Sequence, residues 1–156
     1  MDIWSKSKRS AVMSRIRSRN TGPELAVRHL LWSMGYRYRL HARELPGTPD
    51  IVFRRKHAAI FVHGCFWHLH AGCRDGTLPK SRKKYWHTKL RNNTIRDRRQ
   101  IRTLRLSGWR VLRLWECEVQ NYPKQVSTKL NRFLRAKQPG REGNSHPGAT
   151  KDGTAA

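Results

Sequence analysis

The sequence predicts a single α/β domain built on a mixed central sheet flanked by helices. The chain has 156 residues, which is enough for one core of ordinary domain size and too short for two. Its apolar residues change period along the chain in the order helix, three strands, long helix, strand, helix. This alternation of element types predicts the α/β class.

The first predicted helix spans residues 22–34. Thr21 and Glu24 have the spacing of a capping box, and Pro23 stands in the first turn, where its missing N–H does no harm. Gly35 is a natural stop after the helix. Four apolar residues follow at about helical spacing: Leu25, Leu30, Leu31 and Met34.

Three strands are predicted after this helix. In residues 36–40 two tyrosines and a leucine alternate with arginines, which is the period of a half-exposed strand. The turn at residues 45–49 contains Pro, Gly and a second Pro, and it delivers Asp50 to the start of the next strand. Residues 50–62, with a polar turn at their middle, are predicted to form a hairpin at the centre of the sheet.

The second half of the domain supplies a long helix, a strand and a last helix. The basic helix is predicted at about residues 82–106, capped by Ser81 and ended by Gly108. Residues 109–115 alternate as a strand, and Pro123 opens the last helix. The inward positions of the long helix are predicted to be Tyr85, Leu90, Ile95, Ile101 and Leu104.

Both ends of the chain differ from this domain, which is predicted at residues 21–136. Residues 1–20 interleave serines with lysines and arginines, as in an arm that becomes ordered on DNA; a solvated basic tail is the alternative. Residues 137–156 contain no large apolar side chain and are predicted to be a disordered tail.

The charge of the chain points to a polyanionic partner. There are 34 Lys and Arg against 10 Asp and Glu, a formal net charge of +24, so nucleic acid is the leading partner and an anionic membrane surface the competitor. A spanning helix needs roughly 18 apolar residues, and no such stretch or secretory signal is visible. We therefore expect a cytoplasmic protein whose three cysteines are thiols or thiolate ligands rather than disulfides.

Metal-ligating residues crowd into residues 63–73, which hold three of the eight histidines and two of the three cysteines. Cys65, His70 and Cys73 have the pattern C-x4-H-x2-C, and Cys117 follows the last predicted strand. Three sulfurs and one imidazole make a complete tetrahedral set for zinc, with no position left for substrate. The sequence predicts a structural zinc site, and three ordinary thiols are the alternative.

A second kind of chemistry is available to residues that zinc would leave unused. Asp50 begins a strand after a turn, where a carboxylate is a suitable ligand for Mg²⁺, and His68 or His63 could activate water for phosphodiester hydrolysis. Glu24 could join them and Asp97 could orient a histidine. The alternatives are a capping-box role for Glu24, an ion pair with neighbouring arginines for Asp97, and a surface imidazole for His68.

Three large aromatic side chains fall in or after this segment: Phe66, Trp67 and Trp86. Exposed aromatics beside a basic surface stack on bases or wedge between base pairs. The alternative is that they belong to the core, which is hardest to achieve for the adjacent pair Phe66 and Trp67.

Several segments together resemble the very-short-patch-repair DNA mismatch endonucleases. They are LPGTPDIVF at 45–53, HGCFWH at 63–68, RDRR at 96–99, GWRVL at 108–112 and WEC at 115–117. The resemblance runs from about residue 5 to 135, and HGCFWH with its upstream PG-x-PD is highly specific. It implies a fold like that of type II restriction endonucleases, with a structural zinc site.

The resemblance also implies an activity and the residues that perform it. Members of the family nick DNA 5′ of the T in T:G mismatches that arise when 5-methylcytosine deaminates. By matching motif, Asp50 and the backbone carbonyl of Val62 would hold Mg²⁺, and His68 would be the general base for the attacking water. His63, Glu24 and Asp97 would support catalysis.

The remaining motif residues would bind zinc and DNA. Cys65, His70, Cys73 and Cys117 match the structural zinc ligands. Phe66, Trp67 and Trp86 match aromatics inserted beside the mismatched pair from the major groove, while the N-terminal arm, with Met13, Arg15 and Arg17, enters from the other side. The expected partners are double-stranded DNA with a T:G mismatch and other mismatch-repair proteins, with the chain acting as a monomer.

Two other functions stay open at this level. A restriction-like nuclease would cleave paired and mismatched duplexes alike. A non-catalytic, zinc-stabilised DNA-binding module would bind without regard to Mg²⁺ and leave no nicks.

Overall fold

The computed structural model describes residues 19–136. The strands are β1 (Arg39–Leu40), β2 (Ile51–Phe53), β3 (Ala58–His63) and β4 (Arg110–Trp115). The helices are α2 (Gly22–Ser33), α3 (Lys83–Leu106), α4 (Glu116–Asn121) and α5 (Pro123–Arg135), with short 3-10 turns η1 (Arg54–Lys56) and η2 (Arg74–Gly76). Most of the predicted arm, including Met13, Arg15 and Arg17, and the predicted tail lie outside the described residues.

The strands form one mixed sheet in the order β1-β2-β3-β4. β1, β2 and β3 are antiparallel neighbours, with Ile51 opposite Ile60, so the predicted hairpin is confirmed. β4 runs parallel to β3, and its last residue Trp115 lies opposite His63. The α3 crossover thus brings the segment before Cys117 beside the segment that leads to Cys65.

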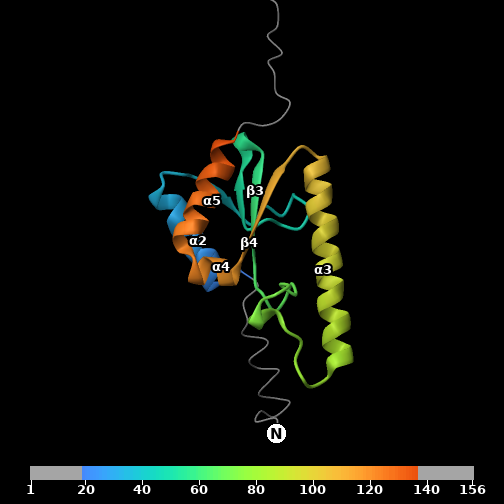
Figure 1. Ribbon diagram of the computed structural model, residues 1–156. Helices are drawn as coiled ribbons and strands as arrows, with labels where there is room; N and C mark the ends of the chain where they lie inside the picture. The colour runs from blue at the N-terminus through green and yellow to red at the C-terminus, as the bar shows by residue number, and fades with distance from the viewer. Residues whose placement is uncertain (1–18, 137–156) are drawn as a thin grey trace, which may run out of the picture.

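Helices cover both faces of this sheet, as Figure 1 shows. Alternate strand residues such as Ile51 and Ile60 pack with Val27, Leu31 and Leu130 of α2 and α5. The opposite face carries Phe61, which packs with Ile101 and Leu104 of α3. Because successive strand residues point to opposite faces, the two clusters form two layers of core. The mixed α/β class predicted from the sequence is confirmed.

The structure differs from the prediction in three details. Tyr85 and Ile95 are exposed rather than inward, because each is five residues from the buried Leu90 and so lies about 140° around the helix from it. The first half of α3 lies beside the loop after β3 (Figure 1). Arg82, not Ser81, is the N-cap of α3. The short helix α4 was not predicted. On α2 itself, Val27 is on the buried face and Leu25 is 41% exposed.

Within residues 19–136, no helix is long and apolar enough to cross a membrane.

Candidate active site and metal centre

A cavity of about 450 Å³ lies where β2 begins and β3 ends, facing α3. Four of the five predicted catalytic residues line it: Asp50, His63, His68 and Asp97. They come from the residue before β2, from the end of β3, from the loop after β3 and from α3. Glu24 does not line the cavity, but its carboxylate lies behind it, with an oxygen within 4.8 Å of an oxygen of Asp50.

The turn at residues 45–49 positions Asp50 at the open end of the hairpin formed by β2 and β3. Gly47 and Thr48 adopt positive φ angles of 78° and 48°, and a Cβ on Gly47 would lie 3.2 Å from the ring of Phe61. The glycine is therefore required by both backbone angle and space. Asp50 Oδ2 accepts the backbone N–H of Val62 at 2.8 Å, while burial raises the pKa of this carboxyl to about 6.

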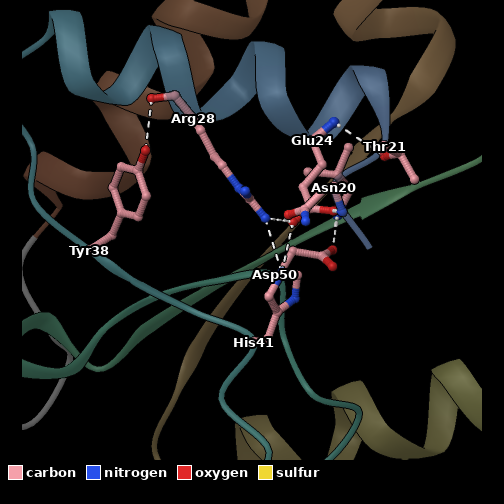
Figure 2. A network of polar contacts seen from close by, with 8 residues as sticks. Asn20, Thr21, Glu24, Arg28, Tyr38, His41 and Asp50 are labelled. Atoms are coloured by element: carbon pink, nitrogen blue, oxygen red, sulfur yellow. Dashed lines mark hydrogen bonds and ion pairs between the residues drawn. The ribbon is translucent and has the colours of Figure 1, made fainter. Parts of the chain in front are cut away.

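Glu24 contributes both to the N-terminal cap of α2 and to the candidate active site (Figure 2). Its N–H donates to Thr21 Oγ1 at 3.4 Å, as in a capping box, but its carboxylate accepts the N–H of Asn20 at 2.9 Å rather than that of Thr21. Glu24 is 2% exposed, and Arg28 forms an ion pair with it. The guanidinium offsets the cost of burying this carboxylate.

His41 is a site residue that the sequence analysis missed. The ring Nε2 of His41 lies 3.3 Å from Glu24 Oε1 and 3.0 Å from Arg28 Nη2. Its backbone N–H donates to the carbonyl oxygen of Asp50 at 3.1 Å. The residue has a positive φ of 47°, which a side chain adopts at some cost. Burial lowers the pKa of His41, although Glu24 opposes the shift.

His68 is oriented by Asp97. The Nδ1 of His68 hydrogen-bonds to Oδ2 of Asp97, so this nitrogen carries the proton and Nε2 is left as an acceptor. Burial alone would raise the pKa of Asp97, but the hydrogen bond and charge of His68 outweigh it and lower the pKa. In the described residues Asp97 forms no ion pair with its neighbouring arginines.

His63 lies under His68 and is buried. The two rings stack with centroids 3.9 Å apart and planes inclined by 8°. Burial, and then the neighbouring His68, lowers the pKa of His63 to about 3. Its Nδ1 has no hydrogen-bond partner within the described part of the chain. His63 is therefore a neutral imidazole near pH 7.

α3 positions the loop that carries His68. Asn93 Nδ2 donates to the carbonyl of Trp67 at 3.3 Å, and Thr94 Oγ1 donates to the carbonyl of His68 at 3.4 Å. Asp97 is on the next turn of the same helix. One helix thus fixes both the backbone and the imidazole of the predicted base.

The predicted zinc ligands come together in a second site. One donor atom each from Cys65, His70, Cys73 and Cys117 lies within 4.8 Å of all the others. The Nδ1 of His70 is 3.6 Å from Cys65 Sγ and 3.3 Å from Cys117 Sγ. Burial raises the pKa of the Cys65 thiol to about 12, so a cation would be needed to hold it as a thiolate. Three sulfurs and an imidazole fit zinc.

Trp115 connects the two sites. Its ring stacks on His70 with centroids 4.0 Å apart and an angle of 11°, and it meets His63 edge to face at 5.7 Å. The alternation of residues 109–115 predicted that Trp115 lies on a strand, but it indicated no role for this side chain. The register that sets it opposite His63 could not be derived from the sequence.

The predicted DNA-contacting aromatics form one cluster. The centroids of Phe66, Trp67 and Trp86 lie 5.1 to 6.1 Å apart, and none of the three belongs to the two core clusters. Lys89 Nζ lies 5.8 Å from Trp67 and 5.6 Å from Trp86. The half-buried rings and the ammonium form a surface that is both aromatic and basic.

A mixed sheet with a carboxylate and an oriented imidazole around one cavity, in a chain of net charge +24, has the features of a hydrolase that acts on a polyanion. The family model described as DNA mismatch endonuclease Vsr matches residues 1–74. The type II nicking enzyme V.XorIIP of Xanthomonas oryzae is 53% identical over 77% of this chain and 88% of its own length. The DNA mismatch endonuclease Vsr of Escherichia coli is 38% identical over 85% of each chain.

The chain belongs to the Vsr family of DNA mismatch endonucleases. It is accordingly a DNA endonuclease, a hydrolase of phosphodiester bonds. The resemblance inferred from the sequence motifs is confirmed.

Proposed function

We propose that the chain is a strand-specific nicking endonuclease that cleaves double-stranded DNA 5′ of the T in a T:G mismatch and so initiates very-short-patch repair. The observation that carries the proposal is that Asp50 and the Asp97-oriented His68 line one cavity. The relatives named as nicking enzymes and as a mismatch endonuclease support it.

In the proposed mechanism His68 is the general base. Because Asp97 accepts a hydrogen bond from Nδ1–H, the lone pair on Nε2 can take a proton from a water molecule as it attacks phosphorus, while the bond from phosphorus to the 3′-oxygen breaks and that oxygen leaves. Asp97 then stabilises the imidazolium that forms. His63 cannot share the proton near pH 7, since its pKa is about 3, and it instead supports the ring of His68 from below.

Asp50 and Val62 fit the Mg²⁺ site. The N–H of Val62 points at Asp50, and the N–H and C=O of one strand residue point to the same side of the strand. The carbonyl of Val62 therefore faces the side where Asp50 lies, and two hard oxygen donors suit Mg²⁺. Bound there, Mg²⁺ would neutralise charge on the scissile phosphate. Glu24 and His41, which lie near Asp50, would support the position of its carboxylate.

Zinc is proposed as a brace, because four ligands leave no position open for substrate. It would join the loop after β3 to the start of α4 through Cys117. Removing it with a chelator should disorder residues 64–76 and abolish nicking, and adding Mg²⁺ alone should not restore the activity. If activity survived the loss of zinc, the brace would be unnecessary.

Other parts of the proposal rest on the family assignment. Phe66, Trp67 and Trp86 would contact the mismatched pair, with the arm containing Met13, Arg15 and Arg17 on the opposite side of the duplex. We further propose a restriction endonuclease-like fold, action as a monomer in the bacterial cytoplasm, and cooperation with other repair proteins.

The deciding experiment compares nicking of a T:G duplex with nicking of a fully paired duplex of the same sequence, with and without Mg²⁺. We expect Mg²⁺-dependent nicks 5′ of the mismatched T only. Asp50→Asn and His68→Ala should each lower the rate by about a hundredfold or more, whereas His87→Ala, an exposed histidine of α3, should not. Equal cleavage of both duplexes would indicate a restriction-like nuclease, and binding without nicks a DNA-binding module.

A further inference from the structure

A groove of about 870 Å³ runs along the outer edge of β4. Val111 packs toward α3 and Leu112 packs toward α5, on opposite faces of the sheet, yet both line this groove. A cavity that contacts consecutive residues of a strand must lie across its edge. A second hollow shares Leu112, Glu118 and Lys129 with it and continues along α5.

The backbone at this edge is open. Within residues 19–136, β4 pairs with β3 alone. The N–H of Arg110 donates to the carbonyl of His57, next to β3, at 2.7 Å, so by alternation the N–H and C=O groups of Val111 and Arg113 point outward. The next outward N–H, that of Trp115, is accepted by Glu118 Oε2 at 3.0 Å, which agrees with this direction.

Positive charge surrounds the groove. It is lined from three elements by Arg98, Arg102, Arg105, Arg113 and Lys129. Glu118 is the acidic member of the lining, and it is already engaged by Lys129 Nζ at 3.1 Å and by the N–H of Trp115. Apolar side chains complete the lining, including Leu106, which is 79% exposed. The groove thus combines apolar contacts with four arginines that form no ion pair within residues 19–136.

We infer that this groove binds an acidic, extended polypeptide segment of a partner protein, which adds to the sheet as a strand beside β4. An added strand supplies both donors and acceptors for the open groups of Val111 and Arg113. A DNA backbone could satisfy the N–H groups but offers no donors for the carbonyls. Alternate side chains of the segment would face α3 and α5, and carboxylates at both places would meet cations.

The groove is separate from the catalytic cavity. The two share a single lining residue, Ile101, and none of the predicted catalytic residues lines the groove. A partner segment could therefore occupy it while DNA lies against the cavity. Peptide binding is measured without nicking, so failure of this inference and failure of the proposed function are distinguishable.

The test measures fluorescence anisotropy of a labelled peptide in which Glu alternates with Val, titrated with the full-length chain. A matched peptide with Lys in place of Glu and a labelled oligothymidine are run beside it. We expect the Glu peptide to bind, with an affinity that falls as salt rises, and the Lys peptide not to bind. Reversing charge in the double variant Arg102→Glu with Arg105→Glu should weaken binding at least about tenfold. Arg91→Glu, on the same helix outside the groove, is the control.

Arg113→Pro tests the strand pairing itself when it is compared with Arg113→Ala, which removes the same charge but keeps the backbone N–H. The N–H of residue 113 points outward and donates to no strand of the sheet, so proline is compatible with the edge but removes one peptide contact, and it should weaken binding more than alanine does. Insensitivity to both sets of variants would overturn the inference. The inference would also be overturned if oligothymidine bound more tightly than the Glu peptide and the same variants abolished its binding. Amide exchange of the free full-length protein that is already slow at Val111 and Arg113 would mean that the chain's own ends or a second copy fill the groove.

Discussion

The imidazole rings of His63 and His68 lie face to face, 3.9 Å apart between centroids, and only one of them can take part in proton transfer. Two stacked imidazolium ions would repel each other, and burial holds the pKa of His63 at about 3. Of the two histidines, only His68 is hydrogen-bonded to Asp97. The sequence offered either histidine as the base, whereas this geometry favours His68 and makes His63 its neutral support.

Asp97→Asn tests the orientation of His68. The amide cannot stabilise an imidazolium as a carboxylate does, and it can donate to Nδ1, which would select the wrong tautomer. We expect kcat for nicking to fall about a hundredfold or more, with little change in KM because Asp97 is buried beneath His68. Steady-state nicking over a range of concentrations of the mismatched duplex measures both. Glu44→Gln, which removes an exposed carboxylate paired with Arg54, should leave kcat unchanged; a similar loss there would indicate a general charge effect.

His63 and Asp50 bind protons in opposite ways on folding. The pKa of His63 falls from 6.5 to about 3, so its proton binds more readily to the unfolded chain, and acid lowers the free energy of unfolding through this group. The pKa of Asp50 rises from 3.8 to about 6, so its proton binds more readily to the folded chain, and acid raises that free energy. Between about pH 4 and 6 the two effects oppose each other.

In Mg²⁺-free protein, removing either group should therefore reveal the pH dependence of stability that the other group produces. Relative to the unchanged chain, Asp50→Asn should lose stability as the pH falls from 6 to 4, and His63→Gln should gain it, each by at most about 1.4 kcal/mol per pH unit. Urea unfolding at several pH values across this window measures the difference. Curves for both variants that stay parallel to that of the unchanged protein would contradict the assignment.

Local signals were sufficient for much of the fold. Thr21 and Pro23 marked the start of α2, and the turn before Asp50 placed the hairpin, because both depend on a few adjacent residues. α4 was missed because its six residues are too few to show a helical period. Ile95 was assigned inward from spacing alone, but what lies opposite each turn of α3 depends on the path of residues 64–82.

The same distinction holds for the candidate site. The zinc ligands and the aromatic cluster were predicted because their residue types are distinctive and close in sequence. His41 has no such signal: it is an isolated histidine between Leu40 and Ala42, and its contact with Glu24 depends on a positive φ and on a helix that precedes it by many residues. The stacking of Trp115 on His70 likewise depends on the parallel register of β3 and β4.

Gly76→Ala tests the zinc loop with a single methyl group. A Cβ at Gly76 would lie 2.3 Å from the carbonyl oxygen and 3.0 Å from the nitrogen of His70, so the backbone that presents this ligand must move. We expect zinc affinity to fall about 10–100-fold, as when the support of a ligand is lost. Competition with a chromogenic chelator measures it. Gly22→Ala has no atom within 4 Å of the new methyl and should bind zinc normally. Equal zinc affinity in both variants would show that the loop adapts.

Trp67→Ala tests whether the aromatic cluster reads the mismatch. Trp67 packs against Phe66 and Trp86 outside the core, so its loss should affect DNA more than folding. We expect binding to the T:G duplex to weaken by about 1–3 kcal/mol, the usual worth of an aromatic contact with a base, while binding to a paired duplex changes less. Trp32→Ala, which removes a 59% exposed ring on α2, should alter neither. A fall in melting temperature with unchanged discrimination between the duplexes would assign Trp67 to packing alone.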